Sequence, residues 1–212
     1  MKEKLGFNPW WKMWIRPRET IRQIVKTNPN YRLVWLSLVY ALPSLFYLAQ
    51  KLSWGVNLNF WLILLICVAL AIPVGFIGFC INSFLIMLTG KLVKGKGTFR
   101  EIRAAFAWSS VPNTVNIALW LILIITFGSH VFLANFPTML YSSVHGAILQ
   151  LALILQLAVA IWMFVIFLHA LGEVQGFSAW MAFLNVVLGI IVWVVFIYLL
   201  TWVLGLVIGG GS

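Results

Sequence analysis

Residues 90–106, which read GKLVKGKGTFREIRAAF, decide the fold, because they place a dense run of charges between two long apolar stretches. Three glycines permit a tight turn there. Thr98 and Glu101 then match a capping box, in which a hydroxyl at the helix N-cap is followed three residues later by a carboxylate. We therefore expect a charged turn outside the membrane and a helix that starts at Thr98. Five cations make this segment the candidate basic surface: Lys91, Lys94, Lys96, Arg100 and Arg103.

The composition excludes a soluble globular protein. Of the 212 residues, 63% are hydrophobic and only 8% are charged, whereas a soluble domain carries about 25% charged residues to solvate its surface. The apolar runs are long and continuous, which excludes a membrane β-barrel, because barrel strands alternate between apolar and polar residues. The sequence therefore predicts an all-α, polytopic membrane helical bundle.

The apolar runs divide the chain into a membrane domain and two short ends. Residues 1–32 are basic and rich in tryptophan, and from Pro17 onward they predict a short amphipathic helix in the headgroup region. The alternative is a cytosolic tail that packs on the protein's own loops. Residues 209–212, GGGS, resemble an expression linker. Between them, residues 33–208 form the membrane domain, with five predicted transmembrane helices at about 33–49, 58–88, 104–127, 144–171 and 179–208.

The positive charges indicate the orientation in the membrane. The net charge is +10; eight of the fourteen Lys and Arg residues precede the first apolar run, five lie in residues 90–106, and only Lys51 lies elsewhere. By the positive-inside rule we expect the N-terminus and the 90–106 turn in the cytosol and the C-terminus outside. The pattern favours anionic lipid headgroups over nucleic acid as the charged partner, in a bacterial cytoplasmic membrane.

Polar side chains within the predicted helices form a candidate site. Ser109, Asn113 and Asn116 share one face of the third helix through their i, i+4, i+7 spacing, and Asn82 and Ser83 lie at a similar depth in the second. Such side chains are costly in hydrocarbon unless hydrogen-bonded, so they should face the bundle. They either hydrogen-bond the second helix to the third, or line a polar cavity, open to the cytosol, that binds a lipid headgroup, a peptide or a partner helix.

His169 and Glu173 form a second candidate constellation at the end of the fourth helix. Their i, i+4 spacing places them on one helix face. One interpretation is an ion pair from Glu173 to Arg100 or Arg103, which would join the two turns. The other is a pH-responsive pair, because histidine titrates near neutral pH.

The sequence contains no recognisable catalytic, metal or cofactor site. Residues 95–98, GKGT, lack the earlier glycine and the preceding strand of a phosphate-binding loop, so we expect no nucleotide. The three histidines stand on separate elements without ligand spacing. No nucleophile motif or intramembrane carboxylate pair is present. We therefore expect neither enzyme activity nor a cofactor.

Three segments resemble the bacterial branch of the Yip1 domain family, which consists of five-span membrane proteins. They are RPRETIRQIVKTNP (residues 16–29), GKGTFREIRAAFAWSSVP (95–112) and GEVQGFSAWMAF (172–183). Trp108 stands where the family commonly has tyrosine. The resemblance implies an all-helical domain with a cytosolic N-terminus, and bacterial relatives linked with export or envelope-stress systems imply an accessory role in a membrane complex.

Two functions are compatible with these observations. The first is a non-enzymatic scaffold or accessory subunit, which binds another membrane protein or a second copy of the chain and contacts anionic lipid. The alternative is a small transporter, channel or lipid-handling protein that uses the polar residues between the second and third helices.

Overall fold

A computed structural model describes residues 6–136 and 144–209, and the side chains of residues 6–136 and 144–203. Every regular element in those ranges is a helix, and five helices are long and apolar enough to cross a membrane. The predicted fold class is therefore confirmed. The predicted linker at 209–212 lies outside the described residues except for Gly209.

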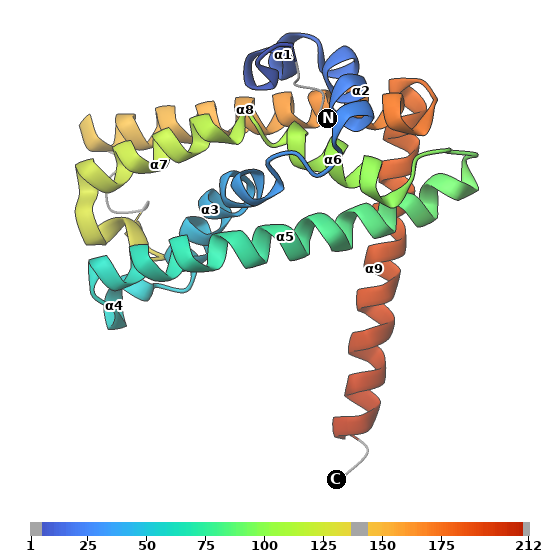
Figure 1. Cartoon of the computed structure of the whole chain (residues 1–212). Helices are drawn as coiled ribbons and strands as arrows, with labels where there is room; N and C mark the ends of the chain where they lie inside the picture. Colours follow the sequence, from blue (N-terminus) through green and yellow to red (C-terminus); the bar gives the residue numbers. More distant parts are fainter. Residues whose placement is uncertain (1–5, 137–143, 210–212) are drawn as a thin grey trace.

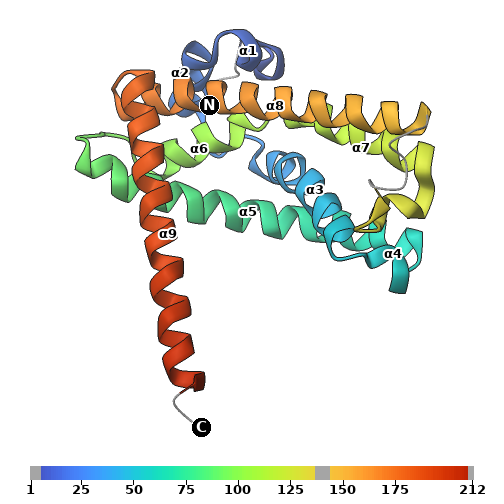
Figure 2. The same ribbon diagram turned by 180° about the vertical axis from the view of Figure 1, so that it is seen from behind.

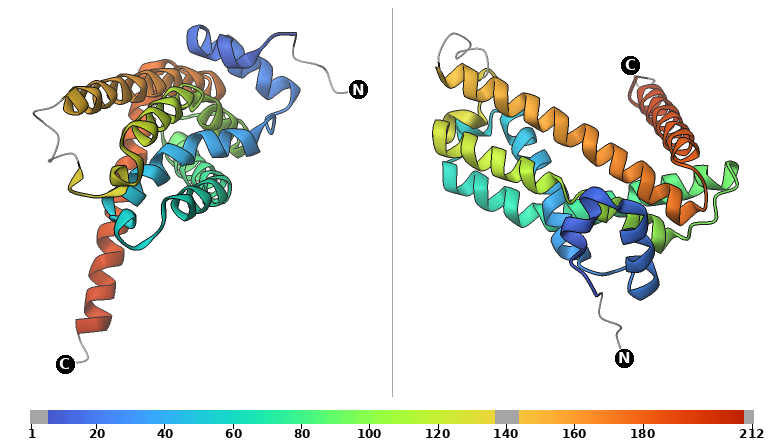
Figure 3. Two further views of the ribbon diagram at one scale, coloured as in Figure 1. Left: turned by 90° about the vertical axis from the view of Figure 1, so that its left-hand side faces the viewer. Right: turned by 90° about the horizontal axis from the view of Figure 1, so that it is seen from above.

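Four long helices pack together as a bundle (Figures 1 and 3): α3 (Leu33–Lys51), α5 (Phe60–Leu92), α7 (Asn113–Phe127) and α8 (Val144–Gln175). With 33 residues, α5 is about 50 Å long, so it exceeds the hydrocarbon core of a bilayer by about 20 Å. A short helix, α4 (Trp54–Asn57), and a 3₁₀ helix, η1 (Gly128–Phe132), close the end of the bundle that lies away from the charged turn.

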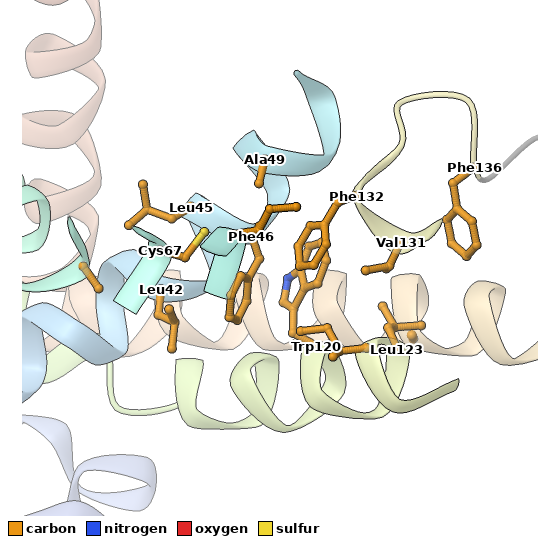
Figure 4. Packing of buried hydrophobic residues seen from close by; sticks show 14 of the residues in the cluster. Leu42, Leu45, Phe46, Ala49, Cys67, Trp120, Leu123, Val131, Phe132 and Phe136 are labelled. Carbon is orange, nitrogen blue, oxygen red and sulfur yellow. The ribbon is translucent and has the colours of Figure 1, made fainter. Parts of the chain in front are cut away.

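The core at that end is aromatic (Figure 4). The ring of Phe132 from η1 lies parallel to that of Trp120 from α7, with centroids 6.4 Å apart and an interplanar angle of 7°. Phe46 of α3 packs against both rings. Aliphatic and small side chains from α3, α5, α7 and η1 fill the space around them, so that one core joins these elements: Leu42, Leu45, Ala49, Cys67, Leu123 and Val131.

The third predicted span is two helices, not one. α6 (Phe99–Ser109) begins with the predicted capping box, in which the backbone N–H of Thr98 donates to Glu101 Oε2 at 2.8 Å. The chain then breaks at residues 110–112, and α7 follows. Pro112 explains the break, because it has no N–H to donate and its ring conflicts with the carbonyl four residues earlier. A continuous helix over 104–127 was therefore a wrong prediction.

Two short helices, α1 (Pro9–Ile15) and α2 (Pro17–Thr27), lie across α6 and α8 (Figure 1). Both start at proline, which suits the first helical position. The predicted amphipathic helix thus forms as α2. Its apolar face, however, is buried within the protein: Ile21 and Ile24 pack in a cluster with Trp108 of α6 and Ala170 of α8. The small side chain of Ala170 leaves room for α2 to dock. Because the apolar face of α2 is buried in this way, it does not meet lipid headgroups.

The last helix, α9 (Ala179–Gly209), leaves the bundle (Figures 1 and 2). It crosses α5 with its first third, where Ala182, Asn185, Val186 and Gly189 are buried. From Ile190 to the last described side chain, every residue is exposed. Of the 18-residue apolar stretch that defines α9 as a candidate span, only 17% is buried against the rest of the chain. The corresponding stretch of α3 is 56% buried. The fifth span therefore forms as a helix but does not pack alongside the other four.

Candidate functional site

The charged turn and the turn between α8 and α9 meet at Gln175. Its side-chain Oε1 accepts a hydrogen bond from the backbone N–H of Gly97, and its backbone carbonyl accepts one from Lys96, both at 3.0 Å. Gln175 is 2% exposed. We call the two loops 93–98 and 176–178, together with Gln175, the turn junction. The junction fixes the start of α6 against the end of α8.

The glycines of the turn junction make room for Gln175. A Cβ on Gly90 or on Gly95 would lie 2.3 Å from the Gln175 side-chain amide. In the loop 93–98, the residue with positive φ is Lys94, at 61°, whereas Gly90 is still part of helix α5. The interpretation that glycine provides a tight turn was therefore incomplete, because these two positions are kept free of a side chain by close approach.

A hydrogen bond beside the junction attaches α9 to α5. The Thr89 hydroxyl donates to Asn185 Oδ1 at 2.7 Å, and both residues are buried. One turn further along α9, Gly189 packs against Ile86. Sequence reasoning missed Gln175, because a polar residue at a helix end ordinarily lies in solvent. It also missed Asn185, which lies inside α9 and has its partner on a helix distant in sequence. The sequence did contain one indication of a close contact between the two turns: the glycines at 90, 95 and 97, together with a second turn bounded by Gly172 and Gly176.

Glu173 pairs with Arg22 of α2, which corrects the predicted partners Arg100 and Arg103. Arg22 Nε donates to Glu173 Oε1 at 2.5 Å. The hydrogen bond and the charge of Glu173 raise the pKa of Arg22 above its usual value. The pairing follows from the docking of α2 on α8, which the sequence pattern did not predict. Within the described residues no bond joins His169 to Glu173, and His169 lines a cleft between α8 and the corner of α1 and α2.

The Arg22–Glu173 pair should make a small, specific contribution to stability. We expect Glu173→Arg to lower the melting temperature of the detergent-purified protein, because two cations then face each other. Combining it with Arg22→Glu should recover most of the loss, since the pair is restored in reverse. Lys26→Glu, on the exposed side of α2, is the matched charge control. Purely additive losses in the double variant would show that the two side chains do not interact.

The predicted basic surface is divided. Lys91, Lys94, Lys96 and Arg100 are exposed. Arg103 instead is half-buried: its Nη2 donates to Asn30 Oδ1 at 2.7 Å, and its guanidinium lies over the Phe99 ring. Arg103 therefore connects α6 to the segment before α3, while the four other cations remain available to solvent or headgroups.

Of the intramembrane polar residues, Asn113 hydrogen-bonds to α3, not to α5. Asn113 Nδ2 donates to the carbonyls of Val39 and Tyr40 at 2.8 and 3.1 Å, and Asn116 Nδ2 donates to Asn113 Oδ1 at 2.7 Å. The predicted hydrogen bonding between the second and third spans was thus wrong in its partner. The break before α7 places Asn113 in its first turn, beside α3. Ser109 donates to the Phe106 carbonyl within its own helix.

The two polar residues of α5 stand apart from this group. Asn82 Nδ2 donates to the Gly78 carbonyl of its own helix. Ser83 is fully buried, and its Oγ has no hydrogen-bond partner among the described residues. Neither lines the pocket that contains Asn113 and Asn116. The five predicted residues are therefore not one site.

A pocket of about 370 Å³ remains around the residues of α6 and α7. Its polar lining comes from Ser109, Ser110, Asn113 and Asn116, with Tyr40 and Ser44 of α3 opposite. Asn116 Oδ1 is buried and has no partner among the described residues, so it is a free hydrogen-bond acceptor. Among the described residues, no Asp, Glu, His or Lys lines the pocket. Its chemistry suits a neutral hydrogen-bond donor.

The comparison with known families agrees with the helical architecture and the sequence motifs. The Yip1 domain matches residues 11–204, which include all three motif segments and all five candidate spans. No curated protein and no solved structure matches the chain. A match over this share of the sequence identifies the family, and the chain belongs to the Yip1 domain family.

Proposed function

We propose that this protein is a non-enzymatic membrane scaffold or accessory subunit, which binds a transmembrane helix of another membrane protein along α9. The observation that carries the proposal is the course of α9. Its base is fixed to α5 by the Thr89–Asn185 hydrogen bond, while every described side chain from Ile190 onward is exposed. A long apolar helix held away from its own bundle leaves both of its faces open to a partner.

The recess between α5 and α9, where the two helices diverge, suits an apolar helix. It holds an open space of about 610 Å³ with an entirely apolar lining, to which α5 contributes Phe84 and Leu88 and α9 contributes Trp193 and Phe196. Association of helices in lipid depends on close packing, because acyl chains already solvate apolar surface. Large rings around a recess provide the shape for such packing. The four exposed cations of residues 91–100 would meet anionic headgroups at the same end.

A photo-reactive amino acid placed on α9 tests this proposal in cells. At Phe196 and at Leu199, both exposed, we expect one discrete adduct of the same mass. Ile125 of α7, which is 83% exposed, is the matched control and should give no such adduct. The adduct should weaken when Leu85→Trp fills the recess. Equal adducts at Ile125, or none at α9, would contradict the proposal, and an adduct of twice the chain mass would identify a second copy as the occupant.

A second candidate function is transport or lipid handling through the polar pocket. The free Asn116 Oδ1 favours it, because a buried acceptor without a partner is costly unless a ligand or water satisfies it. If the pocket is a pathway, Asn116→Leu should abolish the movement of small polar solutes or lipid in liposomes. Thr126→Val on the same helix, which removes an exposed hydroxyl bonded within α7, is the control. Unchanged movement in Asn116→Leu would exclude this pathway.

A further inference from the structure

A cleft of about 400 Å³ lies between α8 and the corner where α1 meets α2. Its polar part is lined by Arg16, Arg18, Glu19 and His169. Its apolar part is lined by side chains from both sides, including Trp14, Trp162, Val165 and Ile166. It is separate from the polar pocket at Asn116 and from the recess beside α9, since it shares no lining residue with either.

The lining changes from polar to apolar along α8. His169 lies two turns from Trp162, about 10 Å along the helix axis, with Val165 and Ile166 between them. A phospholipid has the same profile over the same length, with a charged phosphate at one end and the start of an acyl chain at the other. Tryptophan suits the intermediate level, because its ring is apolar and its N–H is polar.

The two arginines are held differently. Arg18 Nη2 donates to the Phe177 carbonyl at 3.4 Å and lies close to Gly172, where a Cβ would be 3.1 Å from that nitrogen. Among the described residues, the Arg16 side chain has only a longer contact of 3.6 Å to Glu19, and this pair is largely exposed. An exposed pair of this kind contributes little and is readily replaced by a stronger acceptor. Arg18 therefore provides a positioned guanidinium and Arg16 an adjustable one.

The charge of the cleft favours an anion. Arg16 and Arg18 outweigh the single carboxylate of Glu19, and Glu173 nearby is neutralised by Arg22. Arg16 is both the C-cap of α1 and the N-cap of α2, so the two helix dipoles meet there with opposite sign and the positive potential comes from the guanidinium groups. Arginine binds phosphate oxygens through two parallel N–H groups.

We propose that this cleft binds the phosphate headgroup of an anionic phospholipid, with Arg16, Arg18 and His169 around the phosphate and the two tryptophans beside the upper acyl chain. The site does not depend on the proposed role of α9. It also differs from the exposed cations of residues 91–100, because it has an apolar wall for the lipid as well as charge.

Native mass spectrometry of the purified full chain tests the site. In a titration with phosphatidylglycerol, we expect Arg16→Ala/Arg18→Ala to lower the apparent affinity of the tightest lipid at least tenfold, since two charge-assisted contacts are lost. Lys91→Ala/Lys94→Ala removes the same charge from exposed positions and should change it less than threefold. Phosphatidylcholine should bind all variants alike, and millimolar inorganic phosphate should not displace phosphatidylglycerol.

Each contrary result would overturn the assignment. Equal losses in the two double variants would mean that the lipid follows net charge alone. Displacement by inorganic phosphate would identify a free-anion site. If Arg18→Ala lowers the melting temperature, Arg16→Ala and His169→Ala carry the test. Arg16 is exposed, and His169 makes no hydrogen bond or ion pair within the described residues. Unchanged phosphatidylglycerol affinity in both would exclude the cleft.

Discussion

Gly75→Val is expected to destabilise the bundle by about 3 kcal/mol or more, which is the upper part of the range for overpacked cores. Gly75 of α5 lies against the backbone of α3: an added Cβ would stand 2.2 Å from the Ser37 carbonyl oxygen and 2.8 Å from its Cα. Backbone atoms cannot rotate away, so α3 and α5 must separate. Because α3 also receives the Asn113 hydrogen bonds, we expect those to weaken as well.

Unfolding of the detergent-purified protein by increasing SDS, followed by circular dichroism, measures this loss. Gly78→Ala is the matched control, one turn along the same helix. A Cβ there would meet only the edge of the Tyr40 ring at 3.2 Å, and a side chain can move by a few tenths of an ångström. Gly75→Val should therefore unfold at lower SDS than Gly78→Ala, and so should Gly75→Ala, whose side chain matches that of the control. Equal midpoints would show that α3 and α5 do not pack this closely.

The class of fold followed from the sequence because membrane helices are specified locally. A charged fraction of 8% and five long apolar runs require helices that satisfy their own backbone in lipid. The start of α6 was equally local, since the Thr98–Glu101 capping box needs only neighbouring residues. The break before α7 was also visible in principle, because Pro112 removes a backbone donor, but the apolar run around it favoured one continuous helix.

The candidate sites depended on how the helices pack, and the sequence pattern did not contain that information. Spacing placed Asn113 and Asn116 on one face but did not identify α3 as the element opposite. Glu173 had a predicted arginine partner of the right type, yet the actual one is Arg22, because α2 docks on α8 through its apolar face. Gln175 was missed altogether, although its burial determines which residues can occupy positions 90 and 95.

Gln175→Ala is expected to loosen the turn junction and, with it, the direction of α9. The substitution removes the acceptor of the Gly97 N–H and leaves space among Gly90, Gly95 and Gly97. Loss of a buried hydrogen bond with an unpaired donor costs about 1–3 kcal/mol. Spin labels at Lys91 and Val203, with Cys67 and Cys80 replaced by alanine, should give a broader distance distribution in Gln175→Ala than in the parent chain.

A double-mutant cycle with Gly90→Ala separates this contact from a general loss of stability. In the parent chain, Gly90→Ala should destabilise despite the better helix propensity of alanine, because its Cβ would lie 2.3 Å from Gln175 Nε2 and 3.1 Å from Asn185 Nδ2. In the Gln175→Ala background the nearer obstacle is gone, so the same substitution should cost much less or become stabilising. The coupling isolates the contact, because each single change removes one side of it. Additive effects would mean that Gly90 and Gln175 do not touch, and that the direction of α9 is set by its other contacts, such as the Thr89–Asn185 hydrogen bond and the packing of Ala182 and Val186.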